Sequence, residues 1–241
     1  MLTIHDFLAS VDNIHRALAT ELFYAVAFVC KHQGPSKQMR ASGEPYLNHL
    51  AEVAYNVMHI RPIDNPDELL DDETIIAAIL HDIIEDTTVI DHEILQHVFS
   101  KSRGQKFGLR VADMVQAASK KRKTEFIGTD EERSEEAFAR MINYAFQDWE
   151  ILTFKTEDRK HNMRTLGGLR ENLSNQPDKP SDRQRRIATQ TIERFVPFLE
   201  TEALQIVPVR YHHWLLSSAK ELKGESARYL PDDYEIVIRK I

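Results

Sequence analysis

The stretch AAILHDIIEDT, residues Ala77 to Thr87, decides how this chain is interpreted. It is an apolar run that abruptly presents one imidazole and three carboxylates, those of His81, Asp82, Glu85 and Asp86. In a helix, the imidazole and Glu85 stand one turn apart, as do Asp82 and Asp86, so the four side chains share one strip. The surrounding isoleucines and leucines would carry that strip inward, where clustered carboxylates repel one another and lose hydration. A bound divalent cation would remove much of that cost, so the stretch predicts half of a metal site.

The alternative is a solvated helix edge, because helix surfaces carry many charges. The His-Asp dipeptide also occurs at His5-Asp6, where no neighbouring residue suggests chemistry. The metal interpretation therefore depends on further ligands elsewhere in the chain.

Composition limits the classes of protein that the chain can belong to. Its 241 residues fit one large domain or two small ones, and 42% apolar residues with only 8 glycines favour packed helices over disorder. A net charge of −7 argues against non-specific binding to nucleic acid or to an anionic membrane. A small anionic substrate stays compatible, because a metal ion and a few local cations can invert the potential inside one cleft.

Cellular location is suggested by what the sequence lacks. The lone cysteine, Cys30, lies in an apolar run and is expected to be a buried structural thiol. The first residues, MLTIHDFLAS, do not form a signal peptide, and no apolar run reaches the roughly 18 residues of a membrane span. We therefore expect a soluble cytoplasmic protein.

Hydrophobic periodicity predicts an all-α fold, with a single domain over residues 1–241 whose last ~35 residues form a C-terminal helix and a tail. Thr129 and Glu132 form a predicted capping box. The basic run KKRK at residues 120–123 is either a solvated loop or helix end or a functional element. The terminal EIVIRKI is either a strand or a tail. Nine or so helices are expected, at about 14–31, 45–59, from Asp72 through the HD stretch, 91–100, 105–119, 135–147, 149–169, 183–205 and 209–223.

Two more segments could supply ligands. In WEILTFKTEDRKHNMRTL, residues Trp149 to Leu166, an apolar run leads into Asp158, with Asn162 one turn further along and Thr165 within reach of the same face. The alternative is a helix whose solvated end begins at Thr156. The segment RASGEPYLNHLAEVA, which starts at Arg40, places a loop arginine nine residues before His49. A lone histidine on an apolar helix is more often structural than a ligand.

Together, these segments resemble the hydrolase module of RelA/SpoT-type alarmone enzymes and the small alarmone hydrolases, within the HD-domain phosphohydrolases. The resemblance lies in R-x-S-G-E-P-Y-x-x-H (Arg40 to His49), H-D-x-x-E-D-T (His81 to Thr87) and D-R-x-H-N-M-R-T-L (Asp158 to Leu166), and it extends to ELKGESARYLPDDY near the C-terminus. It implies an HD-domain multi-helix bundle around a buried divalent metal site.

The resemblance also assigns residue roles. The implied metal ligands are His49, His81, Asp82 and Asp158. Two imidazoles and two carboxylates suit Mn, Fe, Zn or Co better than calcium, which prefers oxygen alone. The family uses manganese, although the sequence alone does not select it.

The implied catalytic pair is Glu85 and Asp86. One turn past His81 is about 6 Å along the helix axis, a position that suits a base acting on a metal-held water better than a ligand. The implied substrate-binding residues are Arg40 with Asn162 and Thr165 for the base and sugar, together with Ser42. Lys155 and Arg159 are expected to help neutralise phosphate, because they lie beside Asp158 in the sequence.

The sequence departs from the family pattern at several positions. Ala41 stands where the family usually has a lysine, Thr156 and Glu157 stand where it has apolar residues, and Lys160 and Leu50 replace an apolar residue and a proline. None of these is a predicted ligand or catalytic residue, but they leave the preferred purine and phosphate pattern open.

The expected function is Mn-dependent hydrolysis of the 3′-diphosphate of guanosine 3′,5′-bis(diphosphate), giving GDP and pyrophosphate. One alternative keeps the chemistry and changes the substrate to the adenosine alarmone or a nucleotide such as NADPH. Another is a module that binds alarmone without cleaving it, although the intact Glu85-Asp86 pair disfavours this. No synthetase domain is expected after the hydrolase segment. The expected partner is the nucleotide, with neither nucleic acid nor membrane, and a homo-oligomer is left open.

Overall fold

The structure is a computed structural model that describes residues 3–14, 18–32, 43, 45–168, 180–231 and 234. Every regular element in these ranges is helical, which confirms the predicted all-α class. The helices fall into two compact units, which are described separately. The first unit holds helices α1 to α8 and the first residues of α9, and the second holds the rest of α9, helices α10 to α13 and the connector Arg61–Glu68.

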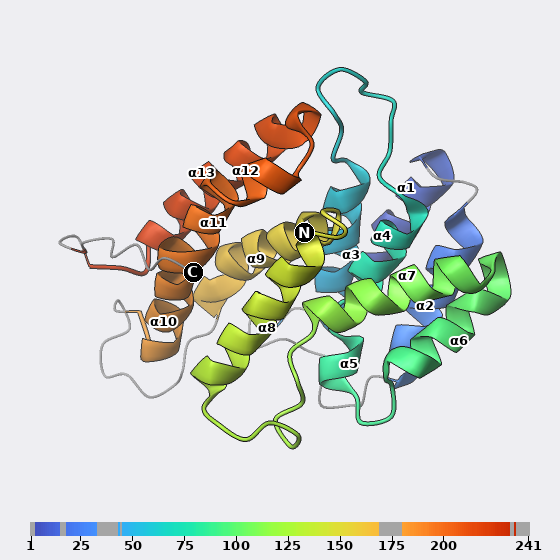
Figure 1. Cartoon of the computed structure of the whole chain (residues 1–241), viewed down its shortest axis with the longest axis horizontal. Helices are drawn as coiled ribbons and strands as arrows, with labels where there is room; N and C mark the ends of the chain where they lie inside the picture. The colour runs from blue at the N-terminus through green and yellow to red at the C-terminus, as the bar shows by residue number, and fades with distance from the viewer. Residues whose placement is uncertain are drawn as a thin grey trace. The chain divides into compact units, whose positions relative to one another are not determined.

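Helix α4 (Asp72–Leu80) is the core element of the first unit (Figure 1). All residues from Thr74 to Leu80 are buried, because the helix is apolar on every side. It contacts α2 (Ala19–His32), α3 (Tyr46–Met58) and α7 (Gln105–Ala118). The remaining helices surround these: α1 (Ile4–Ile14) contacts α2 and α3, α6 (His92–Arg103) forms a hairpin with α7, and α5 (Ile83–Asp86) and α8 (Asp130–Ala145) contact α7.

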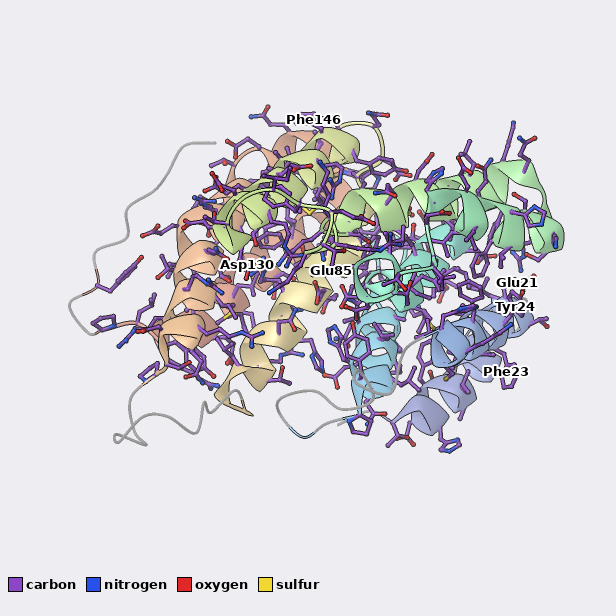
Figure 2. All side chains as sticks on the ribbon, turned by 90° about the horizontal axis from the view of Figure 1, so that it is seen from below. Glu21, Phe23, Tyr24, Glu85, Asp130 and Phe146 are labelled. Carbon is purple, nitrogen blue, oxygen red and sulfur yellow. The ribbon has the colours of Figure 1, made fainter. Side chains whose placement is uncertain are left out.

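Most predicted helices of this unit are present, with shifted ends. Thr129 forms the predicted capping box with Glu132, and α8 therefore starts five residues before the predicted residue 135. Helix α1 was not predicted. Cys30, which was expected to be buried, is exposed near the end of α2, because it lies on the outer side of that helix. Large apolar side chains of α2 are also exposed, among them Phe23 and Tyr24 (Figure 2).

The helix expected to run through the HD stretch is interrupted, and this corrects the sequence prediction. Helix α4 ends at Leu80, residues 81 and 82 form a turn, and α5 restarts at Ile83. The His81 ring donates from Nδ1 to the Ala78 carbonyl at 2.7 Å, the acceptor that the Asp82 N–H would use in a continuous helix. Below the break, the Asp86 N–H bonds the Asp82 carbonyl at 2.9 Å, so this turn stays helical.

The second unit is built on helix α13 (His212–Ala227). It contacts α10 (Asp182–Gln190), the π-helical turn η4 (Thr191–Phe195) and α11 (Val196–Glu200), and α11 is followed by α12 (Ala203–Ile206). The single helix predicted at 183–205 is therefore divided. Pro197 lies in the first turn of α11 and has no N–H to donate, which favours a change of hydrogen-bond register just before it. The predicted loop at 172–182 lies mostly outside the described residues, and EIVIRKI (235–241) lies wholly outside them.

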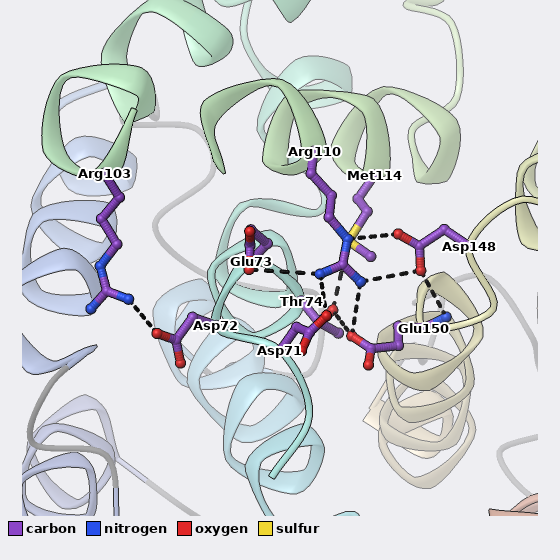
Figure 3. Close-up of polar contacts among 9 residues, drawn as sticks. All are labelled: Asp71, Asp72, Glu73, Thr74, Arg103, Arg110, Met114, Asp148 and Glu150. Atoms are coloured by element: carbon purple, nitrogen blue, oxygen red, sulfur yellow. Dashed lines mark hydrogen bonds and ion pairs between the residues drawn. The ribbon is translucent and has the colours of Figure 1, made fainter. Parts of the chain in front are cut away.

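A cluster of charges around Arg110 ties together three elements of the first unit (Figure 3). The guanidinium of this α7 residue lies 2.6 Å from Asp71 at the start of α4 and 2.7 Å from Asp148, and its other contacts are Glu73 at 3.6 Å and Glu150 at 3.1 Å. Burial raises the pKa of the Glu150 carboxyl, although hydrogen bonds from Thr74 and the charge of Arg110 oppose this. One cation thus holds four carboxylates at the starts of α4 and α9 (Ile151–Thr165).

We predict that Arg110→Gln lowers the free energy of unfolding by about 2 kcal/mol, because removing the cation leaves partly buried carboxylates facing one another. A carboxyl whose pKa is raised on folding stabilises the fold at low pH and loses that contribution as the pH rises through its folded pKa. The difference in free energy of unfolding between wild type and Arg110→Gln should therefore widen as the pH rises above 4.5, the ordinary pKa of a glutamate such as Glu150. Urea unfolding at a series of pH values measures this.

The matched control is Arg103→Gln, which removes the same charge from a guanidinium that contacts two carboxylates, those of Glu21 and Asp72. Arg103→Gln should lower the free energy of unfolding by less than Arg110→Gln does. Equal losses at every pH would contradict the role assigned to the four-carboxylate cluster.

Candidate metal centre

The site is built from the interruption at His81. The ring is fully buried, and a carbonyl can only accept, so the bond from Nδ1 to the Ala78 carbonyl fixes the proton on Nδ1. Nε2 is then the nitrogen with the lone pair that a metal requires. The backbone of this turn is also held from α7, since the Ser119 hydroxyl donates to the His81 carbonyl at 3.2 Å.

His49 faces this ring from helix α3. It is 1% exposed, and the centroids of the two imidazoles lie 5.3 Å apart at an interplanar angle of 76°. His49 lies in the middle of an α3 segment that is buried from Asn48 to Ala51. The sequence left a structural histidine as the commoner alternative. A second imidazole edge-on to His49 favours instead that both rings bind one metal ion.

Helix α9 supplies the carboxylate. Its first residues belong to the first unit, where the Phe154 ring centroid lies 6.5 Å from that of His81. Asp158 follows Phe154 by one turn on the same continuous helix and is 8% exposed. The potential ligand atoms of His49, His81 and Asp158 all lie within 4.8 Å of one another.

This trio meets the requirements of a transition-metal site. Two imidazole nitrogens and one carboxylate oxygen form a mixed set that suits a borderline divalent cation. Burying a carboxylate removes its hydration, and a bound cation would compensate part of that cost. The residues therefore fit a divalent metal, although the geometry does not distinguish manganese from iron, zinc or cobalt.

Asp82, the fourth predicted ligand, is not a member of this trio. One of its oxygens lies 3.3 Å from His81 Nε2 and accepts a hydrogen bond of 2.5 Å from the Tyr46 hydroxyl. Tyr46 starts helix α3, three residues before His49, and the centroids of these two rings lie 5.8 Å apart. Burial, followed by the charges of Asp82 and Asp86, raises the pKa of Tyr46 well above its ordinary value, so the phenol stays a donor. Tyr46 thus orients Asp82 beside the trio.

Glu85 and Asp86 lie on the short helix α5. The Glu85 side chain is 26% exposed, and its Oε1 lies 3.3 Å from the guanidinium of Arg133 on helix α8. Burial and the nearby Asp82 raise the pKa of Glu85, while the charges of Lys120 and Arg133 oppose that shift. Such a carboxylate is a stronger base than one in water, which is the property that proton abstraction needs.

Three of the five predicted substrate-binding residues lie on α9, and the other two lie outside the described residues. The Asn162 amide donates to Asp158 Oδ1 at 2.6 Å, and the Thr165 hydroxyl donates to the His161 carbonyl of its own helix at 2.9 Å. Lys155 is half-buried on α9. Arg40 and Ser42 lie outside the described residues, as does the departure at Ala41.

Three of the other departures from the family pattern, at Glu157, Lys160 and Leu50, have structural explanations. Glu157 accepts hydrogen bonds from the Trp214 indole at 3.1 Å and from Lys160 at 2.9 Å, which ties α9 to α13 within the second unit. Leu50 is 2% exposed and belongs to the core. Thr156 is buried in α9.

The basic run 120–123 contacts the backbone that follows the His81-Asp82 motif. Arg122 donates to the carbonyls of Ile84 and Thr87 at 3.2 and 2.6 Å, and to that of Ile90 at 2.5 Å. Lys123 is solvated and pairs with Asp130. The run is thus a loop, as the first alternative predicted, but its arginine, Arg122, fastens the backbone that follows the HD motif.

Sequence reasoning missed Tyr46 and Arg133. Tyr46 could have been found, because it stands three residues before His49 and so faces the same side of a helix. Arg133 lies in the charged run DEERSEE, where its pairing with a residue 48 positions earlier leaves no local signal.

The geometry therefore defines an all-α protein with a buried cluster of two histidines and one aspartate that can hold a divalent metal. The model of the HD domain family matches residues 25–201, more than half of the chain, and the chain belongs to that family. No helix in the described part of the chain is both long and apolar enough to cross a bilayer.

Similar proteins include enzymes of alarmone metabolism. The bifunctional (p)ppGpp synthase/hydrolase SpoT of Escherichia coli is 35% identical over 86% of this chain and 24% of its own length. The guanosine-3′,5′-bis(diphosphate) 3′-pyrophosphohydrolase of Vibrio cholerae is 38% identical over 69% of this chain and 19% of its own. The GTP pyrophosphokinase of Myxococcus xanthus is 30% identical over 87% and 26%, respectively. The chain spans about a quarter of the length of such relatives, so their names alone do not assign an activity to this segment.

We predict that Tyr46→Phe lowers the affinity for Mn²⁺ by about tenfold, the effect expected when a residue that orients a metal ligand is removed. The ring stays in place while Asp82 loses its donor. Calorimetric titration of purified protein measures the affinity, and His81→Ala, which removes a ligand of the trio, should abolish binding. Unchanged affinity in Tyr46→Phe would exclude Asp82 from the metal environment.

Proposed function

We propose that this chain is a metal-dependent 3′-pyrophosphohydrolase that converts guanosine 3′,5′-bis(diphosphate) to GDP and pyrophosphate. The observation that carries the proposal is the buried His49–His81–Asp158 cluster, with Glu85 four residues beyond its second histidine on the short helix α5. The names of two relatives point the same way, since both include hydrolysis of this class of nucleotide.

The proposed metal is Mn²⁺, with Asp82 completing the ligand set beside the trio. When bound, a divalent cation supplies Lewis acidity and lowers the pKa of a coordinated water. Asp82 suits the ligand role because one of its oxygens already lies 3.3 Å from His81 Nε2. Iron, zinc or cobalt would fit the same donors.

The proposed base is Glu85, which takes a proton from the attacking water at one carboxylate oxygen. Asp86, the next residue on α5, is proposed to align the water by accepting its second hydrogen bond. Asp158 is held by Asn162, so the ligand geometry is maintained while the substrate enters.

The proposed substrate-binding set comprises Arg40, Ser42, Lys155, Asn162 and Thr165. The Lys155 ammonium group would neutralise phosphate charge, and the Arg40 guanidinium, with the Asn162 amide and the Thr165 hydroxyl, would bind the base and sugar. We further propose that residues 1–241 act as one hydrolase domain in the cytoplasm. The chain's excess of acidic residues requires that such cations be concentrated locally, because the whole protein would otherwise repel a polyphosphate.

A second candidate keeps this chemistry and takes the adenosine alarmone or NADPH instead. Ala41 favours it, because the family usually has a lysine there and its loss removes one cation from the substrate side. A panel of nucleotides ranked by kcat/KM distinguishes the two candidates.

We predict that purified protein with Mn²⁺ releases pyrophosphate from the guanosine alarmone, and that Glu85→Gln lowers kcat by about 10²- to 10⁴-fold, the usual contribution of a general base. Glutamine keeps the shape of the side chain but cannot accept the proton. Metal affinity should be retained in this variant, whereas His81→Ala should lose both metal and activity.

Two outcomes would contradict the proposal. Release of no pyrophosphate by the wild type at high enzyme concentration would remove the activity. Tight binding of uncleaved alarmone, unaffected by Glu85→Gln, would instead indicate a module that senses the nucleotide.

A further inference from the structure

Arg133 is an unusually buried arginine on helix α8. It is 7% exposed, and arginines are almost never buried so far unless they are paired. Its Nη1 donates to the Lys121 carbonyl at 2.7 Å and lies 3.3 Å from Glu85 Oε1, while Nε lies 3.5 Å from Asp130 Oδ1. Glu85 and Asp130, both labelled in Figure 2, are therefore joined through one guanidinium.

These contacts make Arg133 a rigid support. The Lys121 carbonyl belongs to the segment after α7, and Asp130 belongs to the first turn of α8, which the capping box at Thr129 fixes. A guanidinium presents its donors in a fixed plane, so two anchored contacts determine where the third one points. The third contact is the Glu85 carboxylate.

The charges around Glu85 show why such support is needed. Asp82 and Asp86 lie on its own turn, Lys120 lies after α7, and Arg133 lies on α8. The two neighbouring carboxylates repel Glu85, and each carboxyl group has several rotamers. Arg133 contacts the Glu85 carboxylate directly at 3.3 Å, and Lys120 acts through its charge.

We propose that Arg133 is a positioning residue for catalysis: it holds Glu85 Oε1, so that Oε2 is the oxygen that takes the proton from water. This inference rests on the proposed function, because it assigns Glu85 the role of base. In the proton transfer, one O–H bond of water breaks, one O–H bond forms at Oε2, and the guanidinium stays protonated throughout.

The same helix offers a matched control. Arg140 lies seven residues further along α8, donates to the Ser119 carbonyl and pairs with Glu136 at 3.4 Å. Both arginines therefore fasten the segment after α7 to α8, and both lose the same charge on substitution by glutamine. In the described part of the chain, Arg133 is the α8 arginine that reaches Glu85.

The test compares Arg133→Gln, Arg133→Lys and Arg140→Gln in the full chain with Mn²⁺ and the guanosine alarmone. We expect Arg133→Gln to lower kcat about tenfold, part of the contribution of a general base, with KM and Mn²⁺ affinity unchanged. Arg133→Lys should recover part of the rate, and Arg140→Gln should leave kcat within about twofold. In a Glu85→Gln background, Arg133→Gln should cause no further loss, because the two residues act as a unit.

Each other outcome overturns the inference. Equal losses of kcat in Arg133→Gln and Arg140→Gln, with parallel drops in thermal midpoint, would indicate a structural role. Full activity in Arg133→Gln would remove the positioning role while leaving the proposed function intact. An inactive wild type would remove the proposed function and this inference with it. If Arg133→Gln does not fold, Arg133→Lys decides, since a folded lysine variant with an unchanged kcat contradicts the proposal.

Discussion

The structure depends on polar groups being placed at the end of a helix that is buried on every side. Helix α4 carries no polar face, so wherever it ends, the next residues begin inside the protein. His81 and the turn after it occupy that place, and burial there costs free energy unless each polar atom is matched. The hydrogen bond from His81 to Ala78 and that from Tyr46 to Asp82 supply part of the match. A cation bound among His49, His81 and Asp158 would add to that match, so the buried end of α4 suits a metal site.

The charges around residues 81–86 bear on how an acidic protein would keep the proposed base and bind the proposed polyanionic substrate. The turn alone carries three carboxylates within five residues. The segment after α7 and the start of α8 provide cations near these carboxylates. Arg122 donates to three backbone carbonyls, and Arg133 contacts Glu85. Basic residues that look like an ordinary solvated run in the sequence are therefore divided between holding the backbone and balancing a side chain. The chain's net charge says little about such a site, because fields at this range are set by the nearest groups.

Local signals determined most of the fold, and contacts distant in sequence determined the rest. The capping box at Thr129 and the apolar run of α4 could be predicted, because periodicity and capping act within a few residues. The interruption at His81 could not, because it arises from a side chain bonding a carbonyl within a run of unbroken helical pattern. The grouping of His49, His81 and Asp158 was anticipated through motif resemblance. The pairing of Arg133 with Glu85 joins residues 48 positions apart and has no sequence signature. The ligand role expected of Asp82 stays a prediction; its side chain lies beside the trio and accepts a hydrogen bond from Tyr46.

The predicted ligands are oriented by their own neighbours, which bears on how the proposed site would function. His81 is held by a backbone carbonyl, Asp82 by Tyr46, and Asp158 by Asn162 one turn further along α9. Side chains that are already ordered lose little conformational entropy when a metal binds. Less of the binding free energy is then offset by the cost of ordering the site. Asn162 carries a second consequence, because an amide with two donors and an acceptor can serve a carboxylate and a nucleotide at once. If it does both, a substrate that contacts Asn162 also fixes the carboxylate of Asp158, and the binding of the nucleotide and the geometry of the metal ligands are coupled through one side chain.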